Sequence, residues 1–65
     1  MFHLQFETAN AAFEGGCGTE IARILRQVAT EFASGSYDGL YEESARLFDI
    51  NGNRVGFWSL EMEEV

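Results

Sequence analysis

The start of the chain alternates strictly between apolar and polar side chains. One parity carries the apolar residues Phe2, Leu4 and Phe6. Because successive side chains of a strand point to opposite faces, this period of two predicts a half-buried strand over residues 2–7. A loop is expected after it, with Phe13 folding back onto the core.

A second pattern, with helical spacing, follows the glycine-rich segment Gly15–Gly18. Its apolar members recur three or four residues apart and are Ile21, Ile24, Leu25, Val28 and Phe32. This spacing draws one apolar stripe along a helix. We expect Thr19 to be the N-cap and Glu20 to lie at the positive end of the helix dipole. Gly35 is expected to adopt the left-handed conformation just past the helix.

A hairpin is predicted by Asn51-Gly52, which separates the apolar runs 45–50 and 54–60. In a two-residue turn both central residues need a positive φ, and Asp49 then faces Arg54. The preceding segment, residues 36–44, is polar and acidic. We interpret it as a loop, with a short irregular strand as the alternative.

The order strand, helix, strand, strand predicts an α+β fold, with one amphipathic helix packed on a small, mostly antiparallel three-stranded sheet. We expect the first strand to pair antiparallel with the last, and a parallel pairing of the first two strands is the alternative. The hairpin is apolar on both sides. Leu47, Trp58 and Leu60 share one parity, and the other holds Phe48, Ile50, Val55 and Phe57. One helix covers one face, so the second face needs a loop, a dimer or a partner.

Length and composition limit the class of protein. The 65 residues allow one domain, residues 1–65, and an apolar content of 46% excludes a disordered tail. A single Cys excludes an internal disulfide and a four-thiolate zinc site. No apolar run is long enough to span a membrane, and no basic start precedes an apolar stretch, so a cytosolic location is expected.

The charge balance is strongly acidic. Eleven acids face four bases, all of them Arg, for a net charge of −7. Such a field repels nucleic acid and anionic membranes, so direct binding to either is not expected. A protein that itself binds nucleic acid is a fitting partner. Charge that serves solubility alone is the other explanation.

No motif indicates catalysis. The segment Gly15–Thr19 lacks the strand and the Gly-Lys-Thr of a phosphate loop, and Asp49–Asn53 departs from a calcium loop at Arg54 and Leu60. Nothing in the sequence brings Cys17 to the only histidine, His3. We therefore predict no enzymatic activity, no cofactor and no metal.

The acids and the exposed aromatic residues are the candidate binding residues. They are Asp38, Glu42, Glu43, Glu61, Glu63, Glu64, Tyr37 and Tyr41, with Phe57 as a further aromatic anchor. If the last strand continues, Glu61 and Glu63 project on the same side about 6.6 Å apart. A row of this kind is similar to the phosphate ladder of nucleic acid, which repeats about every 3.4 Å along a strand. A frayed acidic C-terminus is the alternative.

Three stretches of the chain resemble a group of very small phage and prophage proteins. They are Phe2–Glu7 with Asn10–Phe13, Glu20–Arg26, and Asp49–Gly56. The chain also resembles the small acidic anti-CRISPR proteins that act on type I effector complexes (Cascade), including those of type I-C. No functional residue is carried over by motif.

The resemblance implies a phage-encoded inhibitor in the bacterial cytoplasm, a monomer or weak homodimer, without enzymatic activity. Such a protein binds an effector subunit and blocks target DNA by mimicking it, because these effectors hold DNA in positively charged channels. The alternative function is a small phage structural or assembly protein, or a homodimeric interaction protein.

Overall fold

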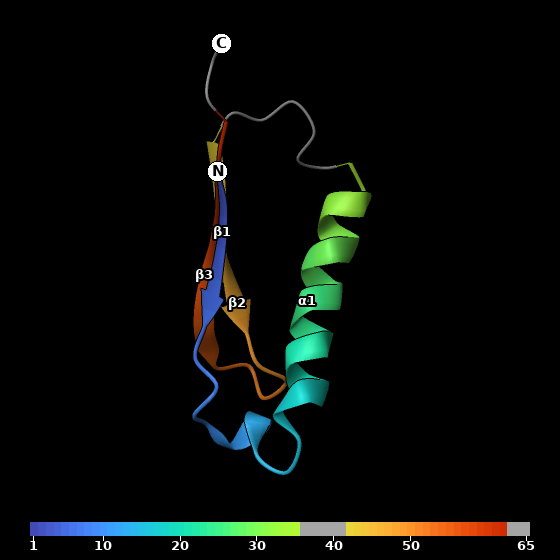
Figure 1. Ribbon diagram of the computed structural model, residues 1–65, viewed down its shortest axis with the longest axis vertical. Coiled ribbons are helices and arrows are strands. Elements are labelled where there is room, and N and C mark those ends of the chain that lie inside the picture. Colours follow the sequence, from blue (N-terminus) through green and yellow to red (C-terminus); the bar gives the residue numbers. More distant parts are fainter. Residues whose placement is uncertain (36–41, 63–65) are drawn as a thin grey trace.

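The structure is a computed structural model that describes residues 1–35 and 42–62. Its elements are β1 (Phe2–Phe6), the 3-10 helix η1 (Ala11–Phe13), α1 (Cys17–Ala33), β2 (Glu42–Phe48) and β3 (Arg54–Glu61). The strand order is β1-β3-β2, and both pairings are antiparallel. Helix α1 runs along one face of the sheet, and η1 closes the end near the β2–β3 turn (Figure 1). The predicted α+β fold is confirmed, and the parallel alternative is wrong.

The core lies between α1 and the sheet. It is built from Phe13, Ile24, Val28, Leu47, Val55 and Trp58, which are all buried. Trp58 is fully buried, and its ring centroid lies 4.8 Å from that of Phe32 and 6.0 Å from that of Phe2. The predicted return of Phe13 to the core is confirmed.

The strand and helix periods hold with one exception. In β1, Leu4 pairs with Trp58 and points toward the helix, as alternation predicts. On α1, Ile24 and Val28 are buried, but Leu25 is 46% exposed, so its predicted place in the apolar stripe is wrong. A single helix packed on a three-stranded sheet buries only a narrow stripe of its side chains, and Leu25 lies outside this stripe.

The ends of α1 differ from expectation at one side only. The helix begins at Cys17 with Gly16 as its N-cap, so the prediction of Thr19 as the cap is wrong. Gly16 has a φ of +151°, which a residue with a side chain rarely adopts, and the Thr19 N–H donates to the Gly16 carbonyl at 3.1 Å. Glu20 lies in the first turn, and Gly35 has the expected left-handed φ of +79°.

The β2–β3 turn is longer than the predicted two residues. Phe48, not Asp49, pairs with Arg54, and the Asp49 N–H donates to the Asn53 carbonyl at 2.9 Å. Among the residues of this turn, only Gly52 has a positive φ, at +85°, so the expected positive φ at Asn51 is wrong. A three-residue loop that ends in a left-handed residue, as residues 50–52 do, is a common hairpin connection.

Strand β2 also begins earlier than the sequence indicated. Residues 42–44 belong to it, so the predicted loop over residues 36–44 is wrong for its last three positions. Residues 36–41 lie outside the described part. Alternation explains the strand, because Ala45 and Leu47 face the core while Ser44 and Arg46 point outward.

A β-bulge shifts the β2–β3 register by one residue just after the turn. Leu47 pairs with Gly56 and Phe48 with Arg54, so Val55 has no partner of its own on β2. Val55 is buried in the core, and its predicted place on the second face of the hairpin is therefore wrong. Ile50, assigned to the same face, lies in the turn and is 67% exposed. Beyond the bulge, the strands keep the register that a two-residue turn would give.

Candidate functional site

Two acids are buried where the turn meets the start of α1. Glu20 and Asp49 are 5% and 4% exposed. A buried carboxylate is costly unless donors surround it. The donors come from Asn10, Arg23 and the turn, and we call Asn10, Glu20, Arg23 and Asp49 the polar clip.

Glu20 joins α1 to the turn. Its Oε1 accepts from Arg23 Nε at 2.6 Å, and its Oε2 accepts from the Ile50 backbone N–H at 2.7 Å. Arg23 also donates to the Phe48 carbonyl at 2.9 Å. The hydrogen bond from Arg23 lowers the pKa of Glu20, and the Ile50 N–H adds to it against the opposing effect of burial.

Asp49 holds the turn in shape and joins it to η1. Its Oδ1 accepts from the backbone N–H groups of Asn51 and Asn53, each at 2.9 Å, and its Oδ2 accepts from Asn10 Nδ2 at 2.7 Å. Burial raises the pKa of Asp49, but the hydrogen bonds from Asn53, Asn51 and Asn10 together outweigh it, so the pKa lies below its ordinary value.

The polar clip is therefore a structural device. Every carboxylate oxygen of Glu20 and Asp49 accepts a hydrogen bond, and these bonds join η1, α1 and the turn. The same bonds account for the likeness of Asp49–Asn53 to a calcium loop. Within residues 1–35 and 42–62, no three His, Cys, Asp or Glu residues are grouped to hold a metal ion.

The clip predicts a loss of stability in acid. Because the pKa values of Glu20 and Asp49 are lower in the folded than in the unfolded chain, the unfolded chain binds more protons as the pH falls. Their contribution is complete above the ordinary values of 4.5 and 3.8 and is lost below them. The difference in urea midpoint between wild type and Asp49→Asn should therefore shrink between about pH 5 and pH 3. A difference that stays constant over this range contradicts the prediction.

The opposite face of the sheet is covered by no element of the described part of the chain (Figure 1). We call it the open face. The register assigns to it His3, Gln5, Glu42, Ser44, Arg46, Phe48, Arg54, Phe57, Ser59 and Glu61. Phe57 is half-buried, and Phe48 is 46% exposed. The predicted aromatic second face is thus confirmed for these two residues.

Part of the predicted acidic site comes together at one end of the sheet. Glu42 and Glu61 lie directly opposite each other on the open face. Glu43 pairs with Leu60, so it points to the helix side and is half-buried. The remaining predicted site residues lie outside the described residues, and they are Tyr37, Asp38, Tyr41, Glu63 and Glu64.

The other end of the open face is basic, which the sequence interpretation missed. Arg46 pairs with Phe57, and Phe48 pairs with Arg54, so the two arginines lie diagonally across the two rings. A hollow of about 610 Å³ is lined here by Ser44, Ala45, Arg46, Phe48, Arg54 and Phe57. The sequence does show that Arg46 has the same parity as Phe48 and therefore shares its face. It does not place Arg54, because the bulge at Val55 changes the face on which Arg54 lies.

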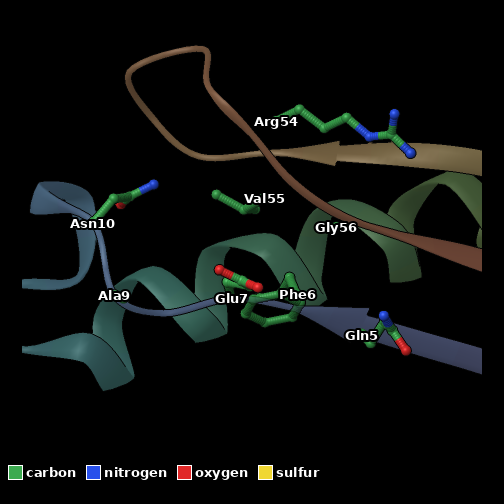
Figure 2. A pocket seen from close by; sticks show the side chains of 8 residues that line it. All are labelled: Gln5, Phe6, Glu7, Ala9, Asn10, Arg54, Val55 and Gly56. Atoms are coloured by element: carbon green, nitrogen blue, oxygen red, sulfur yellow. The ribbon is translucent and has the colours of Figure 1, made fainter.

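A groove of about 580 Å³ lies between the end of β1 and the start of β3 (Figure 2). Its polar lining comes from Gln5, Glu7, Asn10 and Arg54. The Arg54 side chain extends along the strands and away from Val55 (Figure 2), and the Asn10 amide is already bound to Asp49. One carboxylate, one guanidinium and two amides suit this groove to polar contacts.

The two residues weighed for nucleophilic chemistry lie far apart. His3 is near the start of β1, where its Nε2 lies 2.7 Å from Gln5 Oε1 and its ring centroid lies 5.9 Å from that of Phe57, with the two rings tilted by 37°. Cys17 is the exposed first residue of α1, at the opposite end of the sheet (Figure 1). The fold therefore does not form a Cys–His pair.

Comparisons with protein-family models, with curated proteins and with solved structures each found no match to this chain. In the described residues, no helix is both long and apolar enough to cross a membrane. The open face carries Glu42 and Glu61, the two predicted acidic site residues that lie opposite each other in the described part of the chain.

Proposed function

We propose that the chain is a non-enzymatic inhibitor of the anti-CRISPR kind. It binds a subunit of a type I effector complex in the bacterial cytoplasm and covers part of the target-DNA site. The observation that carries this proposal is the Glu42–Glu61 pair, held side by side on a face that no described element covers. Asp38, Glu63, Glu64, Tyr37 and Tyr41 join the binding surface on sequence grounds.

The acidic pair works against the stability of its own sheet. Like charges directly opposite across two strands are destabilising, by an amount on the order of 0.2–1 kcal/mol. Departures from such local rules concentrate at functional sites. The pairing is therefore more readily explained by a partner that supplies cations than by solubility, which separated acids would serve equally well.

The physics of the encounter favours a DNA-binding site. A chain of net charge −7 is drawn toward a basic channel and repelled by free nucleic acid. Strand pairing holds the two carboxyl-bearing side chains with their Cβ atoms about 5 Å apart, so little conformational entropy is lost when cations bind them. Phe57 lies two rows further along the open face and offers an aromatic contact beside the charges.

The proposal is tested by binding to a purified type I-C effector complex. Wild type is expected to bind and to compete with labelled target DNA, with an affinity that falls steeply as salt rises. The double variant Glu42→Gln/Glu61→Gln should bind about tenfold more weakly or worse, since each lost contact to a cation is worth about 1 kcal/mol.

The matched control is Glu7→Gln/Glu14→Gln, which removes two exposed acids from the far end of the sheet and should bind as wild type does. The Glu42→Gln/Glu61→Gln variant should also melt no lower than wild type, because it removes a repulsion. Equal affinity of all three proteins, or inhibition that leaves DNA bound, would refute DNA mimicry.

A second candidate function is self-association, which the exposed ring of Phe48 and the neighbouring Phe57 favour. In a homodimeric or assembly protein these rings would be covered by another copy. Sedimentation at about 100 µM separates the two functions. A concentration-dependent dimer lost in Phe48→Ser supports self-association, whereas a monomer excludes it.

A further inference from the structure

The basic end of the open face is a compact group with its own chemistry. Arg46 and Phe57 form one cross-strand pair, and Phe48 and Arg54 form the next, so guanidinium and ring alternate in both directions. Diagonal neighbours of this kind have Cα atoms about 7–8 Å apart, within reach of long side chains. With Ser44, these four residues line the hollow of about 610 Å³, which we call the arginine hollow.

Arg46 and Arg54 have no acidic partner in the described part of the chain, although the chain is rich in acids. Arg23 is paired with Glu20 at 2.6 Å. In the described ranges 1–35 and 42–62, neither Arg46 nor Arg54 makes an ion pair, although the chain has eleven acids. Two guanidinium groups in successive cross-strand pairs of one face repel each other, and one anion placed between them removes that repulsion.

We propose that the arginine hollow binds a carboxylate side chain of a protein partner, flanked by apolar groups. A guanidinium presents a planar fork of donors that matches a carboxylate, and two forks can grip one group from both sides. The rings of Phe48 and Phe57 provide apolar walls against which neighbouring side chains of the partner pack. Once the partner packs against these rings, water is excluded from the site, which strengthens the charged hydrogen bonds.

A protein carboxylate fits better than a nucleic-acid phosphate. Glu42 and Glu61 lie on the same face, about 20 Å along the strands from Arg54. A polyanion long enough to pass the hollow meets these acids and the net charge of −7. A single carboxylate on a largely basic protein surface does not reach Glu42 and Glu61, and the surface that carries it is not repelled by the net charge.

If the proposed function holds, the inference also specifies the shape of the effector surface. It then carries cations opposite Glu42 and Glu61, and an acidic residue opposite Arg46 and Arg54, about 13–20 Å away along the strands. This arrangement of the effector surface rests on the proposed function, whereas the carboxylate site itself does not.

The site is tested by NMR titration of the isotope-labelled chain with the peptide acetyl-Leu-Glu-Leu-amide. The expected result is saturable shifts at the side-chain N–H groups of Arg46 and Arg54 and at the Phe57 amide. The peptide acetyl-Leu-Gln-Leu-amide, which differs only in charge, should cause at least about fivefold smaller shifts. Inorganic phosphate at equal ionic strength serves as the second probe and should also be weaker.

Variants locate the effect. The shifts should disappear in Arg46→Gln/Arg54→Gln and persist in Arg26→Gln, which removes an exposed arginine from α1. Equal shifts with both peptides, stronger binding of phosphate, or shifts that survive in the double variant would each overturn the carboxylate site.

Binding to the effector complex separates this inference from the proposed function. A uniformly DNA-like surface would bind more tightly once Arg46 and Arg54 are neutralised, because the protein becomes more negative. The carboxylate site predicts at least about fivefold weaker binding instead. If the wild-type chain does not bind the effector at all, the proposed function fails, and the peptide titration alone decides on the carboxylate site.

Discussion

Gly56→Ala is expected to leave most of the protein unfolded at 25 °C. A Cβ built at Gly56 would lie 1.9 Å from the Gln5 carbonyl oxygen and 2.5 Å from the Cα of Phe6. Both are backbone atoms of β1, so the clash is relieved only if β1 and β3 separate. Overpacking of this severity costs at least about 3 kcal/mol, which is most of the stability available to a chain of this size.

The matched control for this variant is Gly18→Ala in the first turn of α1. A Cβ there has no neighbour within 4 Å, so only the helix preference for alanine changes, worth up to about 1 kcal/mol in favour of folding. Thermal melts followed by circular dichroism should therefore move in opposite directions for the two substitutions. A Gly56→Ala protein that melts within about 5 °C of wild type would contradict the close approach of β1.

Asp49→Ala is expected to produce the second-largest loss of stability. The substitution leaves the backbone N–H groups of Asn51 and Asn53 and the amide of Asn10 without their acceptor, in a part-buried position. Unsatisfied donors of this kind are costly, because water reaches them poorly. We expect the melting temperature to fall by roughly 10 °C or more.

Hydrogen exchange shows whether this loss arises at the turn. Protection of the Asn51 and Asn53 amides should disappear in Asp49→Ala and partly survive in Asp49→Asn, which keeps one acceptor oxygen. Glu14→Gln, an exposed position beside η1, should change neither measurement. Retained protection at both amides in Asp49→Ala would show that Asp49 does not organise the turn.

The elements predicted correctly are those determined by local pattern. Alternation in residues 2–6 and the helical spacing of Ile24 and Val28 each depend on neighbours close in sequence, which bury one face whatever the rest of the fold does. The antiparallel pairing of β1 with β3 followed from the small size of the domain. The prediction that Leu25 is buried was wrong because the spacing of apolar residues gives the centre of the buried helix face but not its width.

The turn and the open face required information that the pattern does not contain. Asn51-Gly52 indicates a two-residue turn, but the Asp49 side chain accepts hydrogen bonds from two turn amides and stabilises a longer one. The extra residue would invert every side chain on one strand, and the bulge at Val55 restores the alternation. Arg54 lies on the open face because the longer turn and the bulge occur together, and the local sequence pattern does not predict this combination.

The strand order places β1 and β2 at the two sides of the sheet, each with a row of backbone groups that face outward in the described part. Such rows invite other chains to add as further strands and grow into fibrils. Glu42, Glu43 and Arg46 occupy β2 and oppose this addition, because an incoming strand would bring its charges against theirs. The composition gives an isoelectric point of about 4.3, where much of that protection is lost, so we expect this protein to aggregate more readily in acidic than in neutral buffer.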